Sequence, residues 1–80
     1  MDAAKLTRLQ GQYVSFIYHY SRVNGRAPAE ADIQRYFGVT PPAVHDMILR
    51  LEQAAVIART RGVSRSIRLL VDPETVPRLE

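Results

Sequence analysis

The run from Gly38 to Leu51 constrains this chain most, because three independent signals agree on where a helix begins. Gly38 can end a preceding helix, Thr40 can accept hydrogen bonds from the first free N–H groups, and Pro41 suits the first helical position, where its missing N–H costs nothing. Apolar residues then recur at helical spacing: Val44, Met47, Ile48, Leu51 and Ala55. The sequence therefore predicts a helix from residue 40 to beyond 51, with one stripe facing a core.

The other face of this predicted helix is small and polar, above all near its start. It carries Pro42, Ala43, Asp46, Arg50 and Gln53, with His45, Leu49 and Glu52 at its margin. Such a face near a helix N-terminus is typical of helices that read base edges in the DNA major groove. An ordinary solvated helix surface explains the same pattern equally well from this helix alone.

Two further helices are predicted before this one. Thr7 and Gln10 have the spacing of a capping box, and an apolar stripe continues from there to about Val23. Its members are Leu6, Leu9, Tyr13, Phe16, Ile17 and Tyr20. After a linker at 26–28, residues 29–37 predict a shorter helix, and residues 38–40 then form the tight turn of a helix-turn-helix.

The period of the pattern changes after the third helix. Segments 56–60 and 66–71 are rich in β-branched residues and partly alternate, and the connection between them contains Gly62, so they predict a β-hairpin. The stretch from 50 to 68 holds a single acid, Glu52, and five arginines: Arg50, Arg59, Arg61, Arg65 and Arg68. Arginine suits phosphate, so this concentration of charge favours a nucleic-acid partner.

Composition limits what else the chain can be. Eighty residues with a net charge of +3 suffice for one small domain, and the absence of cysteine excludes disulfides and thiolate metal sites. No apolar run is long enough to span a membrane, and residues 1–5 lack the apolar core of a signal peptide. We therefore predict a cytoplasmic protein with one domain over residues 1–71 and a disordered tail over 72–80.

The segment from residue 6 to residue 70 resembles the N-terminal winged helix-turn-helix domain of LexA-type repressors. The matching residues are Leu6-Thr7 with Gln10, Gly25, Pro28, Ile33, Gly38, Thr40-Pro41, Ala43-Val44-His45, Leu51-Glu52, Val56-Ile57, Ser64-Arg65 and Ile67-Arg68-Leu69-Leu70. This resemblance implies an α+β fold of three helices and a C-terminal two-stranded β-hairpin wing. It also implies operator binding, with groove contacts from the third helix at Thr40, Pro42, Ala43, His45 and Asp46.

The chain departs from the LexA pattern in several places. Ala29 stands where a capping threonine is expected, Ala55 replaces the usual glycine after the third helix, and the turn before the third helix is one residue shorter. Pro42 and Asp46 are not the usual base-contacting side chains, so the operator sequence is not transferred. LexA also carries a self-cleaving, dimerising second domain that these residues do not supply, so we expect something other than a complete self-cleaving repressor.

The sequence thus predicts sequence-specific binding to double-stranded DNA by a prokaryotic transcriptional regulator, with a homodimer on a palindromic site as one expected arrangement. Base contacts are predicted from Pro42, Ala43, His45 and Asp46. Phosphate contacts are predicted from Thr40, Arg59, Arg61 and Arg65, with Arg8 or Arg50 as a further candidate. The alternative is a winged helix used for protein contact, which an exposed Leu49 would suit.

An enzyme is the weakest interpretation of this sequence, and we predict no cofactor and no metal. Neither His19 nor His45 has a sequence-evident partner that would orient it for catalysis. The carboxylates of Glu30 and Asp32 fall in the first turn of the predicted second helix, where the helix dipole favours them without any chemistry.

Overall fold

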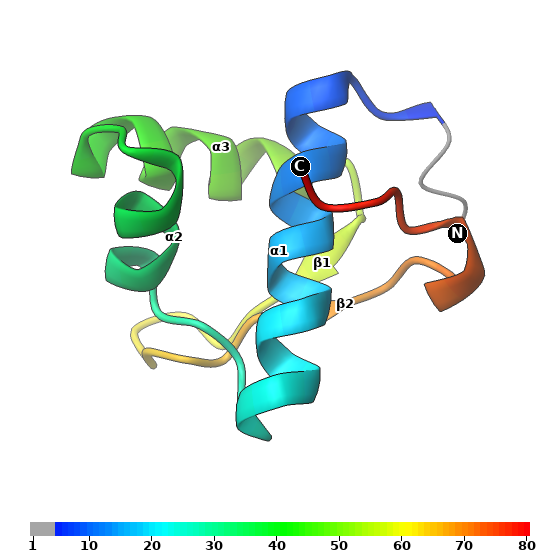
Figure 1. Cartoon of the computed structure of the whole chain (residues 1–80). Coiled ribbons are helices and arrows are strands. Elements are labelled where there is room, and N and C mark those ends of the chain that lie inside the picture. Colours follow the sequence, from blue (N-terminus) through cyan, green and yellow to red (C-terminus); the bar gives the residue numbers. More distant parts are fainter. Residues whose placement is uncertain (1–4) are drawn as a thin grey trace.

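The computed structural model describes residues 5–80 as three helices followed by a two-stranded antiparallel sheet (Figure 1). The elements are α1 (Arg8–Asn24), α2 (Glu30–Phe37), α3 (Pro41–Gln53), β1 (Ile57–Ala58), β2 (Arg68–Leu69) and a short 3-10 turn, η2 (Pro73–Thr75). This is the predicted winged helix-turn-helix. No helix in this range is long and apolar enough to cross a membrane. Residues 1–4, which the predicted domain includes and on which the signal-peptide prediction partly rests, lie outside the described residues.

Local hydrogen bonds fix where the helices begin. In the capping box of α1, Thr7 Oγ1 accepts from the Gln10 N–H at 3.2 Å, and Gln10 Oε1 accepts from the Thr7 N–H at 3.0 Å. Ala29 offers no side-chain cap to α2, but Asp32 Oδ2 accepts from the Ala29 N–H at 2.9 Å. One half of a capping box therefore survives at α2 although the expected threonine is missing.

The joint between α3 and β1 is a sharp bend at Ala55, whose φ is 59°. This left-handed conformation costs an L-amino acid about 1–2 kcal/mol, which is why glycine is usual in such places. The Val56 N–H donates to the Leu51 carbonyl at 3.0 Å and closes the end of the helix. Alanine therefore leaves the course of the chain intact and introduces backbone strain.

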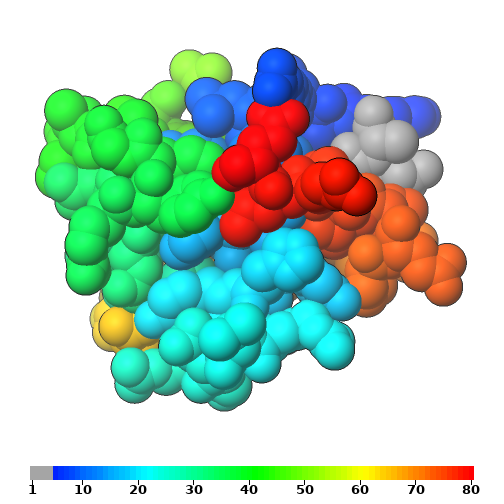
Figure 2. Space-filling view, in the orientation of Figure 1, coloured from blue at the N-terminus to red at the C-terminus, as the bar shows by residue number. Residues whose placement is uncertain are grey.

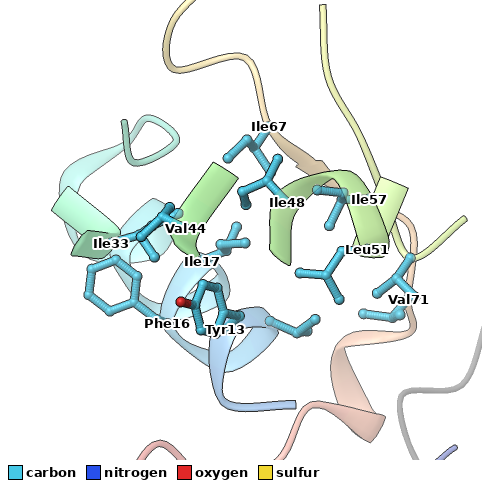
Figure 3. Close-up of a cluster of buried hydrophobic side chains, with 12 residues drawn as sticks. Tyr13, Phe16, Ile17, Ile33, Val44, Ile48, Leu51, Ile57, Ile67 and Val71 are labelled. Carbon is cyan, nitrogen blue, oxygen red and sulfur yellow. The ribbon is translucent and has the colours of Figure 1, made fainter. Parts of the chain in front are cut away.

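Side chains from all three helices, from β1 and from the chain around both strands meet in one core (Figure 3). Its members are Tyr13, Val14, Phe16, Ile17, Ile33, Val44, Ile48, Leu51, Val56, Ile57, Ile67 and Val71. The Tyr13 ring stacks on Phe37 with centroids 4.4 Å apart, and burial raises the pKa of Tyr13. Burial of this apolar surface is the main force that holds the helices and the wing together.

The buried surface of α1 is wider than the predicted stripe. Leu9 was expected in the core but is 52% exposed, whereas Val14, which lies off the stripe, is completely buried. All residues from 11 to 17 are buried, because the rest of the domain and the C-terminal segment cover this part of the helix from several sides. An argument from apolar periodicity predicts one buried face of a helix and cannot predict a helix centre that is buried on all sides.

The C-terminal segment, residues 72–80, folds back against α1, where the sequence predicts a disordered tail (Figure 2). Gln12 Nε2 donates to the Arg78 carbonyl at 2.9 Å, and Gln12 Oε1 accepts from the Glu80 N–H at 2.8 Å. Pro77 lies so close to α1 that a Cβ at Gly11 would come within 3.1 Å of its Cγ. One buried glutamine amide thus binds the extended backbone of this segment as a neighbouring strand would.

The wing strands are shorter than the predicted segments 56–60 and 66–71. Only two pairs are in register, Ile57 with Leu69 and Ala58 with Arg68. Beyond them the loop is closed by Ser66, whose Oγ accepts from the Thr60 N–H at 2.9 Å. Side-chain bonds therefore replace the strand pairing that the alternating pattern suggests.

Ser15 leads to a first prediction, because it is completely buried in α1 and its hydroxyl has no hydrogen-bond partner within residues 5–80. A buried polar group without a partner costs about 1–3 kcal/mol, so Ser15→Ala should raise the free energy of unfolding by about 1 kcal/mol in urea titrations. As a control, Ser21→Ala should gain nothing, because the Ser21 hydroxyl donates to the Ile17 carbonyl at 2.7 Å. A less stable Ser15→Ala variant would show that the hydroxyl is satisfied.

Candidate nucleic-acid interface

α3 turns the predicted polar face outward and its apolar stripe inward. Val44, Ile48 and Leu51 are buried in the core. The predicted contact residues near its start are all exposed: Thr40, Pro42, Ala43, His45 and Asp46. The N-terminal half of α3 lies at one edge of the molecule, away from α1 (Figure 1). This arrangement leaves a helix face free to approach a partner.

The start of α3 has an unusual set of hydrogen-bonding groups. Thr40 Oγ1 accepts from the Ala43 N–H at 3.4 Å, as the sequence predicts for a cap. Pro41 and Pro42 have no N–H, so this helix start lacks the free donors with which helix N-termini usually bind phosphate. It offers instead one threonine hydroxyl and a small apolar surface.

An ion pair and a histidine–carboxylate contact lie on the exposed side of α3. Arg50 Nε lies 3.0 Å from Asp46 Oδ2, and both side chains remain more than 60% exposed, so water weakens the attraction. His45 Nδ1 lies 3.3 Å from Glu30 Oε1 of α2. The sequence shows no partner for His45, because Glu30 is fifteen residues away and only the packing of α2 against α3 brings it close.

A concavity of about 720 Å³ separates α3 from the wing. His45, Leu49, Glu52, Arg59, Arg61 and Gly62 line it. Arg59 Nε lies 3.2 Å from Glu52 Oε1, and its side chain is only 19% exposed, so its charge is largely compensated within the protein. Arg61 lies at the exposed wing tip and forms no ion pair with any residue that the structure describes.

Arg65, which the sequence groups with the phosphate contacts, turns back into the protein. Its Nη1 donates to the Tyr20 hydroxyl at 3.1 Å and to the Ala27 carbonyl at 3.3 Å, and lies 3.0 Å from Asp32 Oδ2. The charge pattern could not reveal this, because partners so far apart in sequence meet only through the fold. With Arg50, Arg59 and Arg65 all paired, the wing is less basic than the arginine count suggests.

The Asp32 carboxylate interacts with the Ala29 N–H, the Arg65 guanidinium and the Tyr20 hydroxyl. The N–H of Ala29 lowers the pKa of Asp32 below its usual value, and the Arg65 guanidinium and the Tyr20 hydroxyl lower it further, while burial opposes them. Since the folded state depresses this pKa, the contribution of Asp32 to stability is present at neutral pH and is lost as the pH falls through the lowered value. The carboxylate therefore stays ionised at neutral pH and can bind Arg65.

No protein-family model matches the chain, but curated proteins do. The chain is 40% identical over 72 residues to the LexA repressor of Thermosipho africanus. The matched region covers 90% of this chain and 36% of that protein. The LexA repressor of Mannheimia succiniciproducens is 36% identical over 70 residues, covering 86% of this chain and 33% of that protein. The chain thus spans about a third of the length of these relatives. Over about nine tenths of its length, it is a homologue of the N-terminal region of LexA repressors.

Proposed function

We propose that this domain binds double-stranded DNA sequence-specifically, with α3 in the major groove, and that it regulates transcription in a prokaryotic cytoplasm. The observation that carries the proposal is the exposed N-terminal half of α3 beside the wing, with a concavity between them. The major groove of B-DNA is wide enough to admit one helix. Homology to the N-terminal region of LexA repressors supports the same interpretation.

The exposed residues of α3 suit different parts of the duplex. Pro42 and Ala43 have the small apolar surfaces that pack on a thymine methyl group, and Asp46 can accept a hydrogen bond from a cytosine amino group. His45 stands between them and the wing concavity. The free hydrogen of the Thr40 hydroxyl can be donated to a phosphate. We assign base reading to these α3 side chains and positioning to Thr40.

Phosphate binding by the wing depends mainly on Arg61 in this proposal. Arg59 would first have to leave Glu52, and Arg50 would have to leave Asp46, before either could bind a phosphate. Arg65 is not included, because its guanidinium already has partners within the protein. Arg61→Gln should therefore reduce the magnitude of the slope of log affinity against log salt by about 0.9, the value for one phosphate contact. Titration of random duplexes at several salt concentrations measures this slope.

The control for this measurement is Arg78→Gln, which removes the same charge from the exposed C-terminal segment. It should leave the slope unchanged. A parental slope in Arg61→Gln would show that the wing tip does not touch phosphate. For a parent chain that binds duplex, selection from a random duplex library would give the preferred site.

The proposal also includes pairing of two copies on a palindromic site. A single winged helix offers a small DNA interface, and specific binding in this class gains from two half-sites. The affinity should therefore rise on a site with two half-sites, one helical turn or a multiple of it apart.

One observation favours the alternative of a protein-binding module. Leu9 of α1 and Tyr36 of α2 are 52% and 45% exposed, and with Phe37 they border a concavity of about 540 Å³. An exposed apolar surface of this kind suits a protein partner. A parent chain without salt-dependent duplex binding would favour this second function.

A further inference from the structure

The loop at the tip of the wing is a closed unit. Ser66 Oγ accepts from the Thr60 N–H at 2.9 Å and is within hydrogen-bond distance of the Thr60 and Val63 carbonyls, at 3.1 and 2.8 Å. The Val63 N–H also donates to the Thr60 carbonyl at 3.1 Å. These bonds fix the shape of the loop but do not attach it to the helices.

Two arginines at the ends of the closed loop attach it to the helices. Arg59 pairs with Glu52 of α3. Arg65 contacts Asp32 of α2, Tyr20 of α1 and the Ala27 carbonyl of the segment between these helices. The wing is therefore attached to α3 through one arginine and to α1 and α2 through the other.

We propose that Arg65 is a positioning residue that holds the wing at its working distance from α3 and does not itself contact DNA. The inference rests on the proposed function, because it assigns the wing a role in duplex binding. Its contacts with three separate chain segments set the position of residues 60–66, and with it the width of the concavity that Arg61 borders.

The backbone at residue 65 supports a role for the side chain. Arg65 has a φ of 55°, in the left-handed region where glycine would be relaxed. The side chain is only 31% exposed and that of Asp32 only 15% exposed, so water competes little for the pair. A strained arginine whose guanidinium is engaged in the protein is poorly placed to neutralise a phosphate as well.

The first test compares Arg65→Gln with Arg61→Gln in duplex titrations over a range of salt concentrations. If loss of the anchor leaves the wing docked a tenth of the time, Arg65→Gln should bind about tenfold more weakly, because apparent affinity scales with the competent fraction. Its salt slope should equal that of the parent, whereas Arg61→Gln lowers the slope. A slope lowered by about 0.9 in Arg65→Gln, together with parental hydrogen exchange in residues 60–66, would show a phosphate contact made by Arg65 itself and overturn the proposal.

A second test needs no DNA. Amide hydrogen exchange should become faster in residues 60–66 of Arg65→Gln, with the centres of α1 and α3 unchanged. Arg65→Lys should recover part of the protection, since all three contacts are made by the single nitrogen Nη1. In a double-mutant cycle, Asp32→Asn should add little to the exchange caused by Arg65→Gln.

The two measurements separate the failure of this inference from the failure of the proposed function. Unchanged exchange in the wing of Arg65→Gln would overturn the anchor whatever the chain binds. A parent that does not bind duplex would refute the proposed function, and faster exchange in the variant would still establish Arg65 as the attachment of the wing.

Discussion

Ala43→Glu should fold like the parent and lose measurable duplex binding, whereas Val44→Glu should fail to fold. The two residues are neighbours on α3, but Ala43 is exposed and Val44 is completely buried. A carboxylate at position 43 would face the phosphate-lined groove, and at position 44 it would bring an unpaired charge into the core. Circular dichroism measures folding, and duplex titration measures binding.

A third variant separates charge from size. Ala43→Gln has nearly the same volume as Ala43→Glu without the negative charge, so it should retain more binding if electrostatic repulsion dominates. If Ala43→Glu binds duplex as tightly as the parent, then α3 does not enter the groove. If Val44→Glu has the parent's thermal stability, the orientation of α3 is wrong.

Ile17→Ala should lower the free energy of unfolding by about 2–5 kcal/mol, the usual range for such a change in a packed core. Ile17 is 1% exposed and lies within the cluster of buried side chains in Figure 3. A domain of this size has a total stability of only about 4–12 kcal/mol, so the variant should lose a large part of it and unfold at a much lower urea concentration than the parent. Phe16→Ala should act in the same direction, because Phe16 is 9% exposed.

Val23→Ala is the matched control for these core variants. It removes apolar groups from the same helix, but Val23 is 83% exposed. Substitutions of this kind usually change the stability by no more than about 0.5 kcal/mol. Equal urea midpoints for Ile17→Ala and Val23→Ala would contradict the assignment of the core.

The fold could be predicted because its main signals are local. The capping box of Thr7 and Gln10, the cap at Thr40 and the apolar stripe of α3 each depend on residues a few positions apart, and the structure contains them. The exception is Ala55, which was predicted to belong to the stripe but lies beyond the helix and is exposed. Their agreement on one arrangement is what lets a short chain specify a fold. The sequence also identified correctly which side of α3 is exposed.

The side-chain partners could not be predicted, because each depends on residues brought together only by the fold. The number of arginines gives the charge of the wing but not the direction in which each side chain points. Arg65 was therefore predicted to contact phosphate, whereas its guanidinium binds Asp32. The C-terminal segment is polar enough to resemble a disordered tail, and its attachment depends on distant side chains of α1 and α2, those of Gln12, Arg8 and Tyr36. Both features depend on contacts between segments that are distant in sequence.

The strained joint at Ala55 bears on the entropy of binding. A glycine there would sample backbone angles of both signs, whereas alanine leaves one narrow basin once the chain is folded. Fewer orientations of the wing relative to α3 are then open to the free protein. If both elements bind one ligand, as we propose, less conformational entropy is lost on binding, so strain at this backbone angle lowers stability and favours affinity.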